Sequence, residues 1–215
     1  MPSHADAGMT AMACRAALGL AGALTLVACS TTAPATKHTA GTEIHQDEAG
    51  FALTDTARVG ADTRADYDNA LRVLEQKQYE QGIALLLELT QSAPNLTAPH
   101  VDLGIAYGRS GDLDNAEASL KRALDLNPRH PVAYNELGIL YRRKGQFAAA
   151  RASYEKALAV FPGFHFARLN LAILCDVYLA DLTCALDNYV AYQQAVPDDK
   201  QAGMWIADLR ARVSR

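Results

Sequence analysis

The chain of 215 residues lacks the excess of positive charge that marks proteins that bind nucleic acid. Its 20 basic side chains are outnumbered by 24 acidic ones, which leaves a formal net charge of −4, and no basic stripe runs along the sequence. Because phosphate backbones are bound mainly by clustered lysine and arginine, no nucleic-acid partner is expected. Half of the residues are hydrophobic, as in folded globular chains.

Recognisable catalytic motifs are also absent. The sequence contains no G-x-S-x-G, H-E-x-x-H, P-loop or G-x-G-x-x-G pattern. Three histidines recur near the starts of predicted helices, at His100, His130 and His165. Solvated histidines near turns explain this recurrence better than a metal site does, and helix capping explains the turn-proximal aspartates better than acid–base catalysis. We therefore expect no catalytic residues, no metal, no cofactor and no small-molecule substrate.

The N-terminal segment has the features of an export signal. A charge-free apolar run over residues 16–28 is too short to span a bilayer comfortably as a helix of the mature protein. The run ends in the letters LVAC, with the cysteine at Cys29, and these resemble the lipobox of bacterial lipoproteins. The resemblance implies a lipoprotein signal peptide over residues 1–28 and acylation of Cys29. Several acyl chains would then anchor the protein stably.

Two further features bear on this signal. Ser30 stands where an aspartate would favour retention in the inner membrane, so the resemblance implies the periplasmic face of the outer membrane. The alternative to lipidation is an ordinary secretory signal followed by a chance cysteine. Met9 and Met12 are alternative start residues, because the residues before them are unusual for a signal.

The segment after the cysteine predicts a tether. Residues 29–60 are dominated by threonine, alanine, glycine and charged residues without a sustained apolar period. This composition favours a lipidated, flexible linker that holds a folded domain away from the membrane.

A sequence unit recurs at a fixed interval in the rest of the chain. The letters LGIAY at 103–107 return as LGILY at 137–141, and 137 − 103 = 34. The second half of the unit returns at the same interval, because Ala116 and Pro128 are followed by Ala150 and Pro162. A fixed period of this length indicates helix pairs that stack into a solenoid.

The two clearest units resemble the tetratricopeptide repeat (TPR). Its signature positions are occupied by Leu103, Gly104, Tyr107, Ala116, Leu120, Ala123 and Pro128, and in the next unit by Tyr134, Leu137, Gly138, Tyr141, Ala150, Tyr154, Ala157 and Pro162. The small residues allow the two helices of a unit to approach closely, and the larger side chains fill the space between them. Each proline ends the second helix of its unit.

The resemblance implies an all-α fold, a right-handed TPR solenoid of about four helix-turn-helix repeats over residues 61–199. The expected repeats cover about 63–96, 97–130, 131–164 and 165–199, and an amphipathic helix over residues 200–215 caps the last one. The fourth repeat stays in phase only if one extra residue lies near residues 178–181. That insertion should lengthen the turn or distort the first helix.

Two cysteines, Cys175 and Cys184, fall in the fourth repeat on helices that run antiparallel. In an oxidising periplasm they would pair across the helix pair, with an expected stabilisation of ~2–3 kcal/mol. Two separate buried thiols are the alternative. A redox site is a weaker alternative, because the spacing is not C-x-x-C.

In TPR proteins the first helix of each repeat lines a concave groove, so the resemblance also implies groove positions. The candidates are Tyr67, Leu71, Val101, Ile105, Arg109, Asn135, Ile139, Arg142, Arg143, Phe166, Leu169 and Ile173. The set is apolar with a basic spot at Arg109, Arg142 and Arg143. It suits an extended or helical peptide segment with some acidic character, although solvated arginines are an equal alternative.

Arrays of this family bind other macromolecules and rarely catalyse reactions. The chain is similar to pilotin-type and other envelope-assembly TPR lipoproteins. The resemblance therefore implies a lipid-anchored periplasmic scaffold, with type IV pilus or secretin biogenesis as the leading role. The alternative is an accessory subunit that recruits enzymes of energy-coupled transport or peptidoglycan processing. In either case the partners are a protein segment and, through the lipid anchor, the membrane.

Overall fold

Helix pairs make up most of the computed structural model, which describes residues 42–47, 50–55 and 59–214. The pairs are α1 (Ala61–Glu75) with α2 (Tyr79–Ser92), α3 (Thr97–Ser110) with α4 (Leu113–Leu126), α5 (Pro131–Arg143) with α6 (Phe147–Val160), and α7 (His165–Ile173) with α8 (Leu182–Ala195). A last helix, α9 (Lys200–Val213), follows the fourth pair. The helices α3, α5 and α7 begin one sequence period apart, since 131 − 97 = 34 and 165 − 131 = 34.

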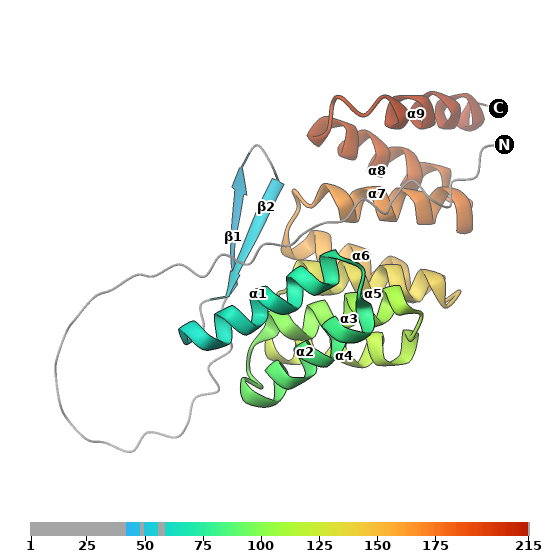
Figure 1. Cartoon of the computed structure of the whole chain (residues 1–215). Coiled ribbons are helices and arrows are strands. Elements are labelled where there is room, and N and C mark those ends of the chain that lie inside the picture. The colour runs from blue at the N-terminus through green and yellow to red at the C-terminus, as the bar shows by residue number, and fades with distance from the viewer. Residues whose placement is uncertain (1–41, 48–49, 56–58, 215) are drawn as a thin grey trace, which may run out of the picture.

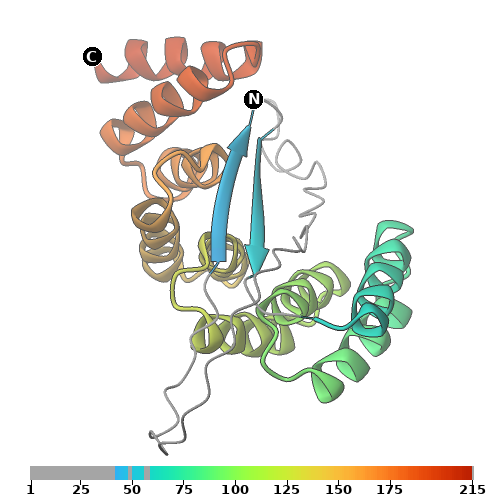
Figure 2. The same ribbon diagram turned by 90° about the vertical axis from the view of Figure 1, so that its left-hand side faces the viewer.

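The pairs stack into a curved array (Figure 1). Each helix contacts the next one along the chain, and α3 also contacts α5. Seen from the side, the array forms an arc with the first helices of the pairs on its inner side (Figure 2). The predicted TPR-like solenoid is confirmed for the helical part of the chain. Over the described residues, no helix has both the length and the apolar character needed to cross a bilayer.

A β-hairpin precedes the helices and corrects one expectation. Strand β1 (Thr42–Asp47) pairs antiparallel with β2 (Gly50–Asp55), and Ile44 lies opposite Leu53. The all-α prediction holds for the array, whereas the prediction of a linker without regular structure is wrong for these two strands. The linker prediction relied on composition, which does not detect the alternation of apolar and polar residues along a strand. Apolar residues at every second position, such as Phe51 and Leu53, are typical of a strand.

Glycine allows the close approach of the two helices within a repeat. A Cβ atom on Gly104 would lie 2.7 Å from Leu120 Cδ2 and 3.3 Å from the Ala116 carbonyl oxygen. A Cβ atom on Gly138 would lie 2.5 Å from Tyr154 Cδ1. Both glycines are buried, and their neighbours from the second helix occupy the space that a side chain would need. The structure thus confirms that small residues space these helix pairs.

The turn inside each repeat uses one residue with a left-handed backbone. These residues are Lys77 (φ 62°), Gly111 (φ 95°), Gly145 (φ 71°) and Ala180 (φ 53°). Their separations are 111 − 77 = 34, 145 − 111 = 34 and 180 − 145 = 35. The fourth repeat therefore contains one extra residue before its turn, as its sequence phase predicted.

The extra residue is accommodated by the first helix of the fourth repeat. Helix α7 continues into a π-helical turn, η1 (Leu174–Tyr178). The backbone N–H of Leu179 donates to the Leu174 carbonyl, five residues earlier, at 3.1 Å. A π turn holds one more residue than an α turn, so it absorbs the insertion without breaking the helix. Of the two predicted results, the structure shows the distorted helix.

The same turn holds a disulfide. Cys175 in η1 is bonded to Cys184 in α8, with an S–S distance of 2.07 Å and a Cα–Cα distance of 5.9 Å. This is the pairing that the sequence favoured over two separate thiols. Cys175 is fully buried, so the bond ties the π turn to the core side of α8.

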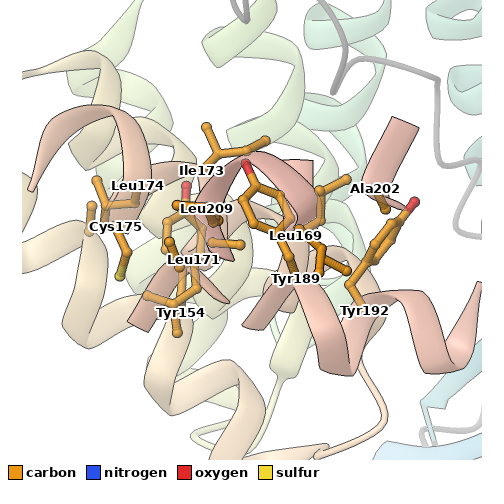
Figure 3. Close-up of a cluster of buried hydrophobic side chains, with 14 residues drawn as sticks. Tyr154, Leu169, Leu171, Ile173, Leu174, Cys175, Tyr189, Tyr192, Ala202 and Leu209 are labelled. Atoms are coloured by element: carbon orange, nitrogen blue, oxygen red, sulfur yellow. The ribbon is translucent and has the colours of Figure 1, made fainter. Parts of the chain in front are cut away.

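The largest apolar cluster joins the last two repeats to α9 (Figure 3). Tyr154 of α6, Leu174 of η1, Tyr189 of α8 and Leu209 of α9 are all buried completely. The ring of Trp205 in α9 packs on Tyr189 with a centroid distance of 5.1 Å. Helix α9 therefore covers the apolar face that the fourth pair would otherwise expose, which is the role of a cap in a solenoid.

Candidate functional site

The inner face of the arc is the candidate site. We use the name inner face for the surface formed by α1, α3, α5 and α7. Because these helices recur with the repeat period, equivalent positions line up across neighbouring repeats. One such row is Asp68, Asp102, Glu136 and Asn170. The rows of equivalent residues decide what a partner would meet.

Several predicted groove residues are buried, which corrects their expected role. These residues are Tyr67, Val101, Asn135, Leu169 and Ile173. The four apolar ones belong to the hydrophobic clusters of their repeats. The physical reason is that the first helices of neighbouring repeats pack against each other, so side chains between them are covered. These side chains lie beneath the inner face and are not part of its solvent-exposed surface.

The other predicted positions keep contact with solvent. Arg109 and Arg143 are exposed. Leu71, Ile105, Ile139, Arg142 and Phe166 are half-buried and rest against the apolar clusters or the neighbouring helix. The inner face therefore combines a narrow apolar strip with polar and charged side chains.

Two of the three arginines of the predicted basic spot have partners within the chain. The Arg143 guanidinium donates a hydrogen bond to the Gly108 carbonyl of the preceding repeat. Arg142 lies over the Tyr178 ring, with its Cζ atom 5.8 Å from the ring centroid. Cation–π contacts of this kind are favourable at such distances. Arg109 is exposed and makes neither an ion pair nor a ring contact with the described residues, so the basic spot is weaker than the sequence suggested.

Sequence reasoning missed two carboxyl groups, Asp102 of α3 and Glu136 of α5, which we call the carboxyl pair. Both are half-buried on the inner face. The Tyr67 hydroxyl donates to Asp102 Oδ2, and Asn135 Nδ2 donates to Glu136 Oε1 at 3.2 Å. The signal was present in the sequence, because the two acids lie one repeat apart (136 − 102 = 34) and are therefore equivalent in consecutive repeats.

The surroundings of the carboxyl pair disfavour negative charge. Burial raises the pKa of Asp102 to about 6, against the opposing effects of the Tyr67 hydrogen bond and of Arg109. Burial also raises the pKa of Glu136 to about 7, and the negative charge of Asp102 adds to this rise. Both acids therefore titrate near neutral pH.

A line of polar contacts extends from this pair along the inner face. Asn170 Nδ2 of α7 donates to Asn135 Oδ1 of α5 at 3.0 Å. The Tyr67–Asp102 bond joins α1 to α3, and the Asn135–Glu136 bond lies within α5, so polar side chains occur on all four first helices in two hydrogen-bonded groups. Of these groups, Asp102, Glu136 and Asn170 keep contact with solvent, so they are the ones available to a bound segment.

The histidines differ from the solvated groups that the sequence predicted. His130 is buried, and its Nδ1 accepts a hydrogen bond from the Ala133 N–H at 3.1 Å, which caps α5. Burial lowers the pKa of His130 to about 4. His165 is half-buried, and its ring packs on Phe166 of the same helix and on Tyr192 of α8, with centroid distances of 4.1 and 6.3 Å. The expected capping by aspartates is confirmed at Asp112 and Asp181.

Two further features are not sites that the structure describes. One is a group of two cysteines and an aspartate, and the other is Cys29, the predicted lipidation site. The Cys175, Cys184 and Asp181 ligand atoms lie within 4.8 Å of one another, but the two sulfurs are bonded to each other. A cysteine binds a metal as a thiolate, and the sulfurs of a disulfide are not thiolates, so we assign no metal site to this group. Cys29 and the predicted signal peptide lie in residues 1–41, outside the described residues.

Comparisons with known proteins agree with this architecture. A tetratricopeptide repeat family model matches residues 101–163 and, in an overlapping match, residues 135–175. The comparison with curated proteins found no match.

Solved structures supply the fold-level comparison. The fold is similar to that of MamA (residues 41 to the end) from Desulfovibrio magneticus RS-1, with a TM-score of 0.63, 20% identity, and coverage of 73% of this chain and 88% of that chain. A thermophilic TPR protein from Thermus thermophilus, TTC0263, gives a TM-score of 0.60 and 25% identity, covering 70% of this chain and 82% of that chain. The first TPR of Spaghetti (RPAP3), bound to the HSP90 peptide SRMEEVD, gives a TM-score of 0.52 and 19% identity. The match covers 55% of this chain and 94% of that chain.

Proposed function

We propose that this TPR-type solenoid is a non-catalytic scaffold that binds a peptide segment of a protein partner on its inner face. The observation that carries the proposal is the presence of polar side chains on α1, α3, α5 and α7 beside a narrow apolar strip. A peptide-bound TPR structure among the similar folds supports a peptide as the ligand class. Curved repeat arrays use such extended surfaces for binding.

The proposal includes a role in the cell envelope. The LVAC letters that end at Cys29 support a lipid anchor, and Ser30 supports the periplasmic face of the outer membrane. Within the envelope we assign the protein to assembly of a pilus or secretin, on the resemblance to pilotin-type lipoproteins. Replacement of Cys29 by serine tests the anchor directly. We expect loss of labelled palmitate incorporation and release of the chain from the membrane fraction.

Site-specific photo-crosslinking in cells tests the binding face. A benzophenone amino acid at Arg109, which is exposed on α3, is compared with the same group at Arg122, which is exposed on α4 in the other layer. We expect a discrete crosslinked partner from position 109 and none of that size from position 122. Equal crosslinking from both positions, or crosslinking from position 122 alone, contradicts inner-face binding.

The identity of the crosslinked partner then separates the envelope roles. A secretin or pilin supports assembly of a pilus or secretion channel. A peptidoglycan hydrolase or a transport motor instead supports the alternative, in which the scaffold recruits an enzyme.

A further inference from the structure

The disulfide of the fourth repeat encloses the irregular part of that repeat. Cys175 lies in the π turn η1, and Cys184 lies in the first turn of α8, nine residues later. We call the residues between them, 176–183, the bridged segment. It contains the rest of the π turn, the left-handed Ala180, and Asp181, whose side chain caps α8. The extra residue of the fourth repeat therefore lies inside a covalent ring.

The π turn brings Tyr178 over Arg142. In the preceding repeat, the equivalent contact joins Arg143 to the Gly108 carbonyl, and 143 − 108 = 35. The contact of Tyr178 with Arg142 spans 178 − 142 = 36, because the bridged segment adds one residue. Arg142 itself is the equivalent of Gly108, since 142 − 108 = 34. A first helix that ended in α geometry would instead place Val177 beside Arg142.

Tyr178 covers the solvent side of the Arg142 guanidinium. The Cζ atom of Arg142 lies 5.8 Å from the Tyr178 ring centroid, and the Tyr178 ring packs on Phe147 of α6 at 4.9 Å. The guanidinium also interacts with Tyr154, whose side chain is completely buried and therefore belongs to the core. The Tyr178 side chain, in contrast, is 42% exposed. Removal of the Tyr178 ring therefore opens Arg142 to solvent.

The bridged segment has a second way to hold its extra residue. A π turn is rare in proteins, whereas one more residue in a surface turn costs little entropy. With the extra residue in the turn before α8, the helix would continue in α geometry, and the side chains beyond Leu174 would rotate by about 100°. The disulfide opposes this change, because it limits the conformations of the residues that it encloses. The Asp176–Arg212 ion pair at 2.8 Å also opposes it, but the Arg212 side chain is 39% exposed and such pairs contribute little.

We propose that the bond between Cys175 and Cys184 is a redox-sensitive lock on Arg142. In the oxidised chain, the π turn holds Tyr178 over the guanidinium. In the reduced chain, the extra residue moves into the turn before α8 and Tyr178 rotates away, so the solvent side of Arg142 opens. The reduced chain thus presents a cation on α5 that the oxidised chain covers. The change occurs within the isolated chain and is therefore independent of the proposed function.

The chemical step is exchange with a dithiol reductant. Cys184 is half-buried and Cys175 is completely buried, so a thiolate of the reductant attacks the Cys184 sulfur. The disulfide breaks, and Cys175 leaves as a thiolate that takes up a proton. The second thiol of the reductant loses its proton and displaces Cys184, which is protonated in turn. Two electrons and two protons have then passed to the two cysteines, and the reductant has become a disulfide.

Arginine labelling of the full-length chain, purified in detergent, tests the lock. Phenylglyoxal modifies exposed guanidinium groups, and mass spectrometry of the digested chain gives the rate at each arginine. The chain is labelled in its oxidised form, and again after reduction by dithiothreitol and removal of the reagent under argon. Arg109 is the control, because it is exposed on α3, two repeats before the bridged segment. Tyr178→Ala removes the cover and keeps the bond, whereas Cys175→Ala with Cys184→Ala removes the bond without a reductant.

We expect Arg142 to react at least about fivefold faster after reduction, whereas the rate at Arg109 should change less than about twofold. The double alanine variant should match the reduced chain. Tyr178→Ala should make Arg142 reactive in both redox states, an effect that a merely stabilising bond does not predict. Far-UV circular dichroism and the fluorescence of Trp205 should be the same in both states, because the change is confined to the bridged segment.

Equal labelling rates at Arg142 in the oxidised and reduced chains overturn the lock. Slow labelling of Arg142 in oxidised Tyr178→Ala also overturns it, because Tyr178 is then not the cover. A loss of helix content or a shift of the Trp205 emission on reduction has the same consequence, since the fourth repeat would then unfold instead of changing its register. The labelling needs no partner, so its failure is separate from that of the photo-crosslinking at position 109, which tests the proposed function.

Discussion

The replacement Gly138→Ala tests whether glycine is needed for close packing within a repeat. Gly138 lies in the middle of α5, where alanine is intrinsically favoured over glycine by about 1 kcal/mol. The tertiary structure opposes this gain. The added Cβ would lie 2.5 Å from Tyr154 Cδ1, and Tyr154 is completely buried. Overpacking of a filled core costs about 1–3 kcal/mol, so after the intrinsic gain we expect a net loss of up to about 2 kcal/mol in unfolding free energy.

Gly108→Ala is the matched control on the preceding first helix. A Cβ at this position would meet only Arg143 Nη1 at 3.9 Å and Ala116 Cβ at 4.0 Å, which are ordinary contacts. The intrinsic preference for alanine then remains, and the variant should gain about 0.5–1 kcal/mol. The same chemical change is thus expected to have opposite signs at two positions.

Urea unfolding at pH 7.5 measures both variants. Far-UV circular dichroism reports all the helices, and the fluorescence of Trp205, the single tryptophan, reports the packing of α9 on the fourth repeat. Coincident transitions from the two signals establish that the array unfolds as one unit, which short repeat arrays do when their interfaces are strong. If the two signals give separate transitions, the change in unfolding free energy caused by Gly138→Ala is measured from circular dichroism.

The reasoning is refuted if Gly138→Ala is as stable as Gly108→Ala. That result would mean that α5 and α6 can separate without cost, and that glycine at this position is not required by Tyr154. A loss at both positions would equally contradict the argument, because Gly108 has room for a methyl group.

The remaining predictions concern turns, a buried histidine and the disulfide. Lys77→Gly and Ala180→Gly should each raise the unfolding free energy by about 0.5–1 kcal/mol, because both residues have a left-handed backbone; a loss in urea unfolding would contradict this. The pKa of His130 is lowered by burial to about 4, so its neutral form contributes stability above pH 6.5 that is lost as the pH falls toward 4. The carboxyl pair has raised pKa values, so its protonation stabilises the folded chain over the same pH range. This contribution is common to the parent chain and to His130→Asn, so the difference between their unfolding free energies should show a loss of about 2–3 kcal/mol between pH 7.5 and 4. Reduction of the bond between Cys175 and Cys184 should cost about 2–3 kcal/mol, seen as an earlier Trp205 fluorescence transition in urea, and labelling of both cysteines by a thiol reagent in the unreduced, denatured chain would disprove the bond.

Much of the helical architecture could be read from residue spacing. The interval between Gly104 and Gly138 is the repeat length, and the prolines Pro128 and Pro162 fall two residues beyond α4 and α6. These signals are local and periodic, so they can be recognised without knowledge of tertiary contacts. The hairpin was overlooked because its alternation covers only two short runs, while the surrounding composition is that of a linker.

The candidate site was less accessible to sequence reasoning. A position on the first helix does not reveal whether a side chain lies over the neighbouring helix or beneath it. Val101 and Leu169 are buried for this reason, whereas Arg109 at another helical phase is exposed. Asp102 and Glu136 were overlooked because a charged residue on a helix is usually solvated, and only the packing of α3 against α5 encloses them.

The sequence by itself determined the repeat length, the small residues between paired helices and the extra residue in the fourth repeat, because these features depend on steric demands that recur along the chain. Only the tertiary structure decided which inner-face side chains remain open, which arginines are engaged by neighbouring repeats, and that two acids a repeat apart share one environment. Those properties depend on the packing of separate helices, which brings residues of neighbouring repeats into contact and removes water from around their charges.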